Sequence, residues 1–290
     1  MKTNAIVRIV IWSLVILILV SILFTTLTFR GFSFLKRTSI TVSGSDTADV
    51  PALQQLNFPA SEVRDLKIQW VAGSIVIQPA DVDEIRISES ALSDSKYTMV
   101  CRHSGDKLTV SFCEDTKLNF RFGITLNDIV SKDLTILVPR DWHCDDLQIE
   151  AASATLDVIG LTAGNINFDG ASGTCSFTDC AVDTLDLNTA SGDVTFTGTL
   201  NVLDCDAASA SVYATVSNIP SKIDMDSMSG DLDITLPADA GFTLSLDAMS
   251  SDFTSDFETV SQNGNYISGN GACRIDVDAM SGDVYLRKAK

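Results

Sequence analysis

The sequence predicts an all-β protein: a single-chain, repetitive β-solenoid with coils of about 19 residues, preceded by one N-terminal transmembrane helix. Three observations support this prediction. A short sequence motif, best preserved in Leu185–Phe196, recurs through the second half of the chain, and apolar and polar residues alternate within each copy. One uncharged apolar stretch lies near the N-terminus. The motif is typical of a strand, a Ser-Gly turn and a second strand.

The repeat is recognised from the serine of each turn. The spacings between successive serines are 19, 19, 18, 20, 21 and 31 residues, and the serines are Ser153, Ser172, Ser191, Ser209, Ser229, Ser250 and Ser281. A period near 20 is typical of solenoids, in which each unit buries its apolar face against its neighbours.

Within a unit the alternation has period two, which indicates half-buried strands rather than helices. Before the turn, the inward positions are Leu147, Ile149, Ile166, Phe168, Leu185, Leu187, Leu203, Cys205, Ile223, Met225, Leu244, Leu246, Ile275 and Val277. After the turn, they are Leu156, Val158, Cys175, Phe177, Val194, Phe196, Val212, Ala214, Leu232, Ile234, Val284 and Leu286. A slip of one residue would turn this set toward water, so the register is well specified.

Residues 9–29 contain no charged residue and follow a short tail, residues 1–8. At 1.5 Å per residue, a helix of this length spans about 31 Å, enough to cross the hydrocarbon core of a membrane. The end of this stretch, Thr26-Leu27-Thr28-Phe29, offers no small-residue cleavage site, which favours a retained anchor over a cleaved signal peptide. Basic residues flank the stretch on both sides, so they do not decide its orientation.

Residues 30–61 have the Ser, Gly and Pro content of a linker, and the solenoid domain is expected to span residues 62–290. Within it, residues 62–144 predict irregular N-terminal coils and residues 145–290 the regular repeats. Ala72-Gly73-Ser74 is a degenerate turn, and Tyr97–Phe112 predicts a hairpin around Ser104-Gly105-Asp106-Lys107.

The C-terminal end contains the longest spacing, the 31 residues before Ser281. Its turn signals, Asn263-Gly264 and Gly269-Asn270-Gly271, predict either an inserted hairpin or an irregular extra coil. We expect the last repeat to be the terminal coil, with Arg287, Lys288 and Lys290 discouraging another strand from adding to its edge.

The net charge of −18 is carried by the repeats, because residues 145–290 hold 23 acids and 5 Lys or Arg while residues 1–144 are balanced. Such a surface repels phosphates, so nucleic acid and anionic lipid are poor partners. Of the 7 cysteines, Cys175 and Cys205 are expected in the core, and the absence of Cys-x-x-C argues against a zinc ribbon or a thioredoxin-type site.

The most distinctive polar feature is an outward column that is acidic in six of seven units. It comprises Glu150, Asp169, Asp206, Asp226, Asp247 and Asp278, with Asn188 as the exception. Carboxylates at strand spacing repel one another, and a hard cation such as Ca²⁺ relieves that repulsion. These six residues are therefore candidate ligands of a weak Ca²⁺ site. The alternative is a solvated face that keeps the sheet soluble, and the absence of a known calcium-loop motif favours it.

The sequence offers little catalytic chemistry, and we expect no enzyme activity and no cofactor. His103 lies beside Ser104, and His143 adjoins Cys144 and the pair Asp145-Asp146, but no established catalytic motif surrounds them.

Three methionines share one turn position: Met228, Met249 and Met280. We expect them to pack at the corner of the solenoid; an exposed binding strip is the alternative.

Three of the turns carry a resemblance to a known family: Ser191-Gly192-Asp193-Val194, Ser229-Gly230-Asp231-Leu232 and Ser281-Gly282-Asp283-Val284. Together with Leu236-Pro237 and Gly269-Asn270-Gly271, they make residues 62–290 resemble the "putative adhesin" domain of unknown function in bacterial envelope proteins. Four turns depart from the pattern: Ser153-Ala154, Ser172-Gly173-Thr174, Ser209-Ala210 and Ser250-Ser251. The resemblance implies a membrane-anchored β-solenoid at the cell envelope and transfers no catalytic residues.

The sequence therefore predicts a single-pass cell-membrane protein, anchored by residues 9–29, with an acidic extracytoplasmic solenoid for binding, adhesion or scaffolding. The expected partner is an envelope protein or a wall polymer. Two alternatives remain: a carbohydrate-active β-solenoid enzyme, and an anchored cytosolic accessory of envelope-stress signalling.

Overall fold

The computed structural model describes residues 55–90, 97–114 and 131–290. These residues form nineteen strands and one 3₁₀ turn, η1 (Ala60–Glu62). The first strands are β1 (Gln55–Pro59), β2 (Asp65–Ala80), β3 (Glu84–Glu89), β4 (Val100–Ser104), β5 (Lys107–Ser111) and β6 (Leu134–Pro139). The regular coils begin with β7 (His143–Ile159), β8 (Thr162–Ser172), β9 (Cys175–Ser191), β10 (Val194–Ser209), β11 (Val212–Val216), β12 (Lys222–Ser229) and β13 (Leu232–Leu236). The last strands are β14 (Phe242–Ser250), β15 (Phe253–Ser255), β16 (Val260–Gln262), β17 (Asn265–Ser268), β18 (Cys273–Ser281) and β19 (Val284–Lys288).

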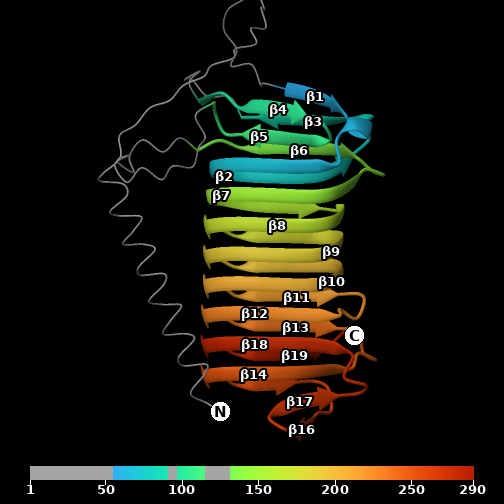
Figure 1. Cartoon of the computed structure of the whole chain (residues 1–290), viewed down its shortest axis with the longest axis vertical. Coiled ribbons are helices and arrows are strands. Elements are labelled where there is room, and N and C mark those ends of the chain that lie inside the picture. Colours follow the sequence, from blue (N-terminus) through green and yellow to red (C-terminus); the bar gives the residue numbers. More distant parts are fainter. Residues whose placement is uncertain (1–54, 91–96, 115–130) are drawn as a thin grey trace, which may run out of the picture. The chain divides into compact units, whose positions relative to one another are not determined.

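Each coil runs along one face, turns just after the repeated serine, at a Ser-Gly corner in most coils, and returns along a second face (Figure 1). We call the segments before the corner the long face and those after it the short face. Neighbouring coils pair in parallel and in register, so that Leu147, Ile166 and Leu185 lie on successive rungs. The predicted β-solenoid-like repeat is therefore confirmed for residues 145–290.

The predicted inward positions form the core, since all are buried except Leu246. Leu246 is half-buried because β14 is the outermost strand of the parallel ladder on the long face. The hairpin strand β17 covers β14 only from Phe242 to Ser245. Leu246 still packs against the core.

The Ser-Gly corner depends on glycine because the backbone there has a positive φ. Gly192 has φ +119°, a region that only glycine adopts readily. A Cβ at this position would also collide with the carbonyl oxygen of Gly173 on the previous coil. Close stacking of the coils therefore excludes a side chain at Gly192.

The coils do not all stack in chain order. β18 lies between β12 and β14 on the long face, and β19 lies between β13 and β15 on the short face (Figure 1). The expectation that the last repeat is the terminal coil was therefore wrong. β14 and β15 form the end coil. Because β15 pairs with β19 from Val284 to Leu286, the strand that ends in Arg287 and Lys288 is not the terminal strand of the stack.

The N-terminal coils show the same arrangement. β2 lies inside, between β7 and the later segments β5 and β6. At both ends of the stack, the coil nearest the chain terminus packs directly against the regular repeats. The coil that comes from nearer the middle of the sequence lies at the outer end of the stack.

Antiparallel strands continue each end of the ladder. β4 pairs with β5 as the predicted hairpin, and β3 and β1 extend the short face beyond β6. At the other end, the 31-residue spacing between Ser250 and Ser281 contains the hairpin β16–β17 rather than an extra coil.

The first described strand begins at Gln55, ahead of the expected boundary at residue 62. The expected membrane span, residues 9–29, lies outside the described residues, among which no helix is long and apolar enough to cross a membrane.

Candidate functional site

The acidic column predicted from the sequence lies on the outer side of the long face. In spatial order, its members are Glu150, Asp169, Asn188, Asp206, Asp226, Asp278 and Asp247. The insertion of β18 places Asp278 between Asp226 and Asp247. Four carboxylates, those of Asp206, Asp226, Asp278 and Asp247, thus occupy consecutive rungs at about 4.8 Å spacing. We call these four residues the acidic ladder.

The opposite end of the column is compensated by basic and amide side chains of β2. Lys67 forms an ion pair with Glu150, and Gln69 donates a hydrogen bond of 2.9 Å to the same carboxylate. Although desolvation acts to raise the pKa of Glu150, these two contacts outweigh it and lower that pKa. Glu150 is therefore part of a local polar network and is separated from the acidic ladder by Asp169 and Asn188.

Two carboxylates of the acidic ladder, those of Asp206 and Asp226, are less well compensated than that of Glu150. Desolvation raises the pKa of Asp226 to about 6, and repulsion from Asp278 and Asp224 adds to the effect. The pKa of Asp206 is raised for the same reasons, with Asp204 and Asp224 as its neighbours. The pair Asp206 and Asp226 therefore favours nearby positive charge, whether as protons or as a cationic partner.

A second column beside the ladder does carry counter-charges. Lys222 lies 2.6 Å from a carboxylate oxygen of Asp224 and 3.9 Å from one of Asp204. Arg274 lies 2.5 Å from an oxygen of Asp276. These exposed ion pairs contribute little stability each, but they neutralise part of the second column.

The geometry of the column bears on the calcium hypothesis. Within the described ranges, no group of three or more His, Cys, Asp and Glu residues converges as a metal cage would require. The carboxylates lie in a row along the stack, one per rung. Weak Ca²⁺ binding by Glu150, Asp169, Asp206, Asp226, Asp247 and Asp278 stays a prediction.

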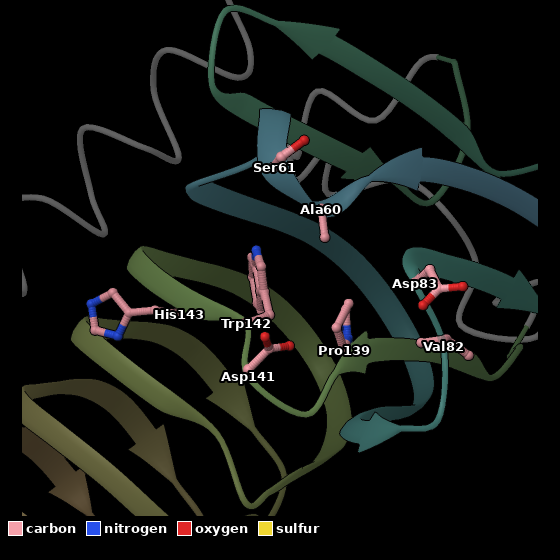
Figure 2. A pocket seen from close by; sticks show the side chains of 8 residues that line it. All are labelled: Ala60, Ser61, Val82, Asp83, Pro139, Asp141, Trp142 and His143. Carbon is pink, nitrogen blue, oxygen red and sulfur yellow. The ribbon is translucent and has the colours of Figure 1, made fainter.

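A shallow depression lies where η1, the β2–β3 turn and the β6–β7 turn meet. Figure 2 shows its lining residues: Ala60, Ser61, Val82, Asp83, Pro139, Asp141, Trp142 and His143. The indole of Trp142 is only 8% exposed and donates a hydrogen bond of 2.9 Å to the carbonyl of Val63. It serves the core and leaves little ring surface for stacking against a sugar.

The residues considered for catalysis in the sequence, such as His143 and Cys144, do not form an acid–base site at this depression. In Figure 2 the His143 ring and the Asp83 carboxylate lie on opposite sides of Trp142. His143 instead approaches Asp145 at 3.5 Å, and Asp145 pairs with Arg64. Burial raises the pKa of Cys144 to about 12, so this thiol is not a nucleophile.

His103 does not add to this region. Its Nε2 lies 3.2 Å from the carbonyl oxygen of Glu62, and its ring meets Phe58 edge-on. The contacts tie the β4–β5 hairpin to the segment that precedes β2. The expected absence of enzyme activity stays a prediction.

No sequence pattern indicates the buried ion pair between Lys132 and Glu89. The Lys132 side chain is fully buried, pairs with Glu89, and donates hydrogen bonds of 2.6 Å to the carbonyls of Tyr97 and Phe112. Its Nζ also lies 4.8 Å from the ring centroid of Trp70. Burial lowers the pKa of Lys132, and the pairing with Glu89 opposes that effect. Because both side chains are buried, we interpret the pair as a structural contact that joins β3 to the segment before β6.

The methionine corner differs from its expected packing. Met228 is 47% exposed and Met249 is 66% exposed, and Met280 between them is half-buried. The prediction that these side chains pack at the corner was therefore wrong for Met228 and Met249. At this position the side chain points away from the core, on the same side as the acidic ladder.

Comparisons with solved structures return bacterial chains of low sequence identity. A chain described as a "putative cell adhesion protein" from Clostridium sporogenes is 10% identical, with a TM-score of 0.36, and the match covers 83% of this chain and 100% of that one. A "putative adhesin" from Bacteroides fragilis is 12% identical, with a TM-score of 0.49, and the match covers 81% of this chain and 98% of that one. These values support no transfer of function. No curated protein matches the chain in sequence.

The family comparison is more informative, because it covers most of the described domain. The profile of the family described as "Toastrack DUF4097" matches twice, at residues 63–201 and 197–287. The two matches coincide with the N-terminal coils plus first repeats and with the remaining repeats. Their extent shows that the chain belongs to the Toastrack DUF4097 family.

Proposed function

We propose that this protein is a non-catalytic, membrane-anchored component of the cell envelope whose solenoid binds a cationic partner through the acidic ladder. One observation carries the proposal: Asp206, Asp226, Asp278 and Asp247 lie on consecutive rungs of one outward face. Membership of the Toastrack DUF4097 family supports a β-repeat domain but does not specify a partner.

The electrostatics of the ladder define the chemistry of that partner. Carboxylates about 5 Å apart repel by roughly 0.8 kcal/mol per pair in water. A partner with matching positive charge relieves this repulsion, and its binding weakens as salt increases. A basic patch on an envelope protein fits, as does an anionic wall polymer bridged by divalent cations.

Co-sedimentation with isolated envelope fragments tests the proposal. The full chain is compared with a variant carrying Asp206→Asn, Asp226→Asn and Asp247→Asn. We expect the variant to lose most of the bound fraction, and binding of the wild-type chain to fall as NaCl increases.

A matched control removes the same charge elsewhere. Asp179, Asp193 and Asp239 are exposed acids outside the long face, and their triple replacement by Asn also changes the net charge by three. This control should bind like the wild-type chain. Equal loss in both variants would mean that only net charge matters, and equal binding by all three proteins would refute the proposed role of the ladder.

The cytosolic alternative has one observation in its favour. No disulfide joins the seven cysteines in the described residues, and five of the seven are buried. Disulfides are common in oxidising compartments, whereas free cysteines are usual in reducing ones. An extracytoplasmic location does not require a disulfide, so accessibility in whole cells has to decide between the two locations.

A further inference from the structure

Three of the six methionines of the chain occupy equivalent positions on three adjacent coils. The pairings on either side fix their neighbourhood: Ser227 pairs with Ala279, and Ser229 with Ser281. Ala248 and Ser250 pair with the same two residues of β18. Met280 therefore lies between Met228 and Met249, with about 4.8 Å between adjacent strands.

These methionines differ from those of the core. Met99 and Met225 are each only 1% exposed, whereas Met228 and Met249 project into solvent. A side chain that stays exposed contributes little hydrophobic stabilisation. Packing therefore does not explain why methionine occupies these positions. The equivalent position in four earlier repeats holds alanine: Ala152, Ala171, Ala190 and Ala208.

Thioether sulfur is a soft, neutral ligand, and soft ligands of this kind select Cu(I) among biological metals. Ag(I) has the same charge and the same preference for sulfur. Methionine is unbranched and has three rotatable bonds, so neighbouring side chains on one face can bring their sulfur atoms to a common ion.

The surroundings favour a cation at this corner. Asp226 and Asp247 each precede a methionine of the trio by two residues and therefore project from the same side of their strands. The nearest basic residues on these strands, Lys222 and Arg274, lie six residues before Met228 and Met280, about 20 Å away along the strand. The local field therefore attracts a monovalent cation, while the thioethers confer the preference for a soft one.

We propose that Met228, Met280 and Met249 form a binding site for a soft monovalent metal ion, Cu(I) or Ag(I). Met280 is the central ligand because its strand, β18, pairs with the strands of both other methionines. The site is distinct from the calcium hypothesis, since Ca²⁺ takes oxygen ligands and has little affinity for thioethers.

The test is a titration of the full chain, labelled with ¹³C in the methionine methyl groups, with Ag⁺ in chloride-free buffer. Ag⁺ stands in for Cu(I) because it does not change oxidation state under these conditions. We expect the methyl signals of Met228, Met280 and Met249 to shift together and saturate with one ion, while those of Met99 and Met225 stay in place.

The cysteine thiols compete for silver but do not obscure this readout. Cys101 and Cys113 are half-buried and are the thiols most accessible to Ag⁺. If they bind first, the three methyl signals begin to move only after about two equivalents. Signals that stay in place through ten equivalents, or that move independently and to the same extent as that of Met1, would overturn the proposal.

Two variants separate coordination from folding. Met280→Leu keeps the size and apolar character of the side chain but removes the central sulfur, and we expect affinity for Ag⁺ to fall about tenfold or more. Met225→Leu alters a buried methionine on β12, the strand that carries Met228, and should bind Ag⁺ like the wild-type chain. An unchanged Met99 signal in both variants, and an unchanged Met225 signal in Met280→Leu, establish that the fold is intact. Equal affinities of the two variants would refute the assignment of Met280.

Discussion

Replacing Gly192 by alanine tests whether close stacking of the corners holds the coils together. The backbone at Gly192 has φ +119°, which costs an L-residue about 1–3 kcal/mol. The added Cβ would also meet the carbonyl oxygen of Gly173. Because that neighbour is backbone and cannot rotate away, the coils must separate, at a further cost of about 1–3 kcal/mol. We therefore expect Gly192→Ala to destabilise the domain by about 2–6 kcal/mol.

Gly105 provides a matched control, because it also has a positive φ, +65°, but no atom lies within 4 Å of a Cβ added there. Gly105→Ala therefore carries a conformational cost of about 1–2 kcal/mol without a collision. In a domain of this size, 1 kcal/mol lowers the melting midpoint by about 2–4 °C. Gly192→Ala should lower it by at least about 4 °C, and by more than Gly105→Ala does.

Thermal unfolding followed by circular dichroism measures this difference, and amide hydrogen exchange locates it. Stability in a stacked repeat is set by nearest neighbours, so protection should fall first in the coils next to the altered corner. The reasoning can fail in a specific way. Ala154 and Ala210 occupy equivalent corners without a positive φ. If the Gly192→Ala corner relaxes to their conformation, the two variants will have equal midpoints and the stacking argument is refuted.

Four further predictions follow from the buried pair, the acidic ladder and the surface. Lys132→Met leaves the Glu89 carboxylate buried without its charge partner and should cost about 3–5 kcal/mol in urea unfolding, with much of the loss recovered by adding Glu89→Leu; no recovery would argue against a charge effect. The folded pKa of Asp226, about 6, lies above its ordinary value of 3.8, so the folded state binds the extra proton and stability falls as pH rises from about 4 to 6. Asp226→Asn should accordingly raise the melting midpoint at pH 7 and reduce its gain between pH 7 and 5; an unchanged pH dependence would contradict this assignment. If the acidic column binds Ca²⁺, millimolar Ca²⁺ raises the midpoint and a chelator reverses the rise, whereas no shift identifies a solvated face. Thr199→Cys places an exposed thiol on the solenoid, and a membrane-impermeant maleimide should label it in intact cells well above the wild-type background; labelling only after lysis would favour the cytosolic alternative.

Several features of the fold could be predicted because they depend on local alternation. The inward positions, such as Leu185 and Leu187, follow from period two and are buried. The corner glycines follow from the repeated Ser-Gly turn, since few other residues adopt a positive φ. The alignment of acidic residues on one face follows from equal spacing of the repeats. Those features are encoded in each unit and do not require knowledge of which unit lies next to which.

The order of the terminal coils could not be predicted for the same reason. Coils with the same apolar pattern can stack on one another in any order, so the alternation does not distinguish the coil that begins at Phe242 from the one that begins at Cys273. The long connection through the β16–β17 hairpin lets β18 return between β12 and β14. As a result, the acidic ladder places Asp278, not Asp247, next to Asp226.

The sequence by itself determined the β repeat, its inward residues, its glycine corners and the sign of its surface charge. Tertiary structure alone decided how the coils at each end are ordered, that Lys132 meets Glu89 across 43 residues, and that Met228 and Met249 face solvent. The physical reason lies in the range of the interactions. Alternation and turn chemistry act within one coil, whereas a buried ion pair or an exposed corner depends on which distant segment packs against it.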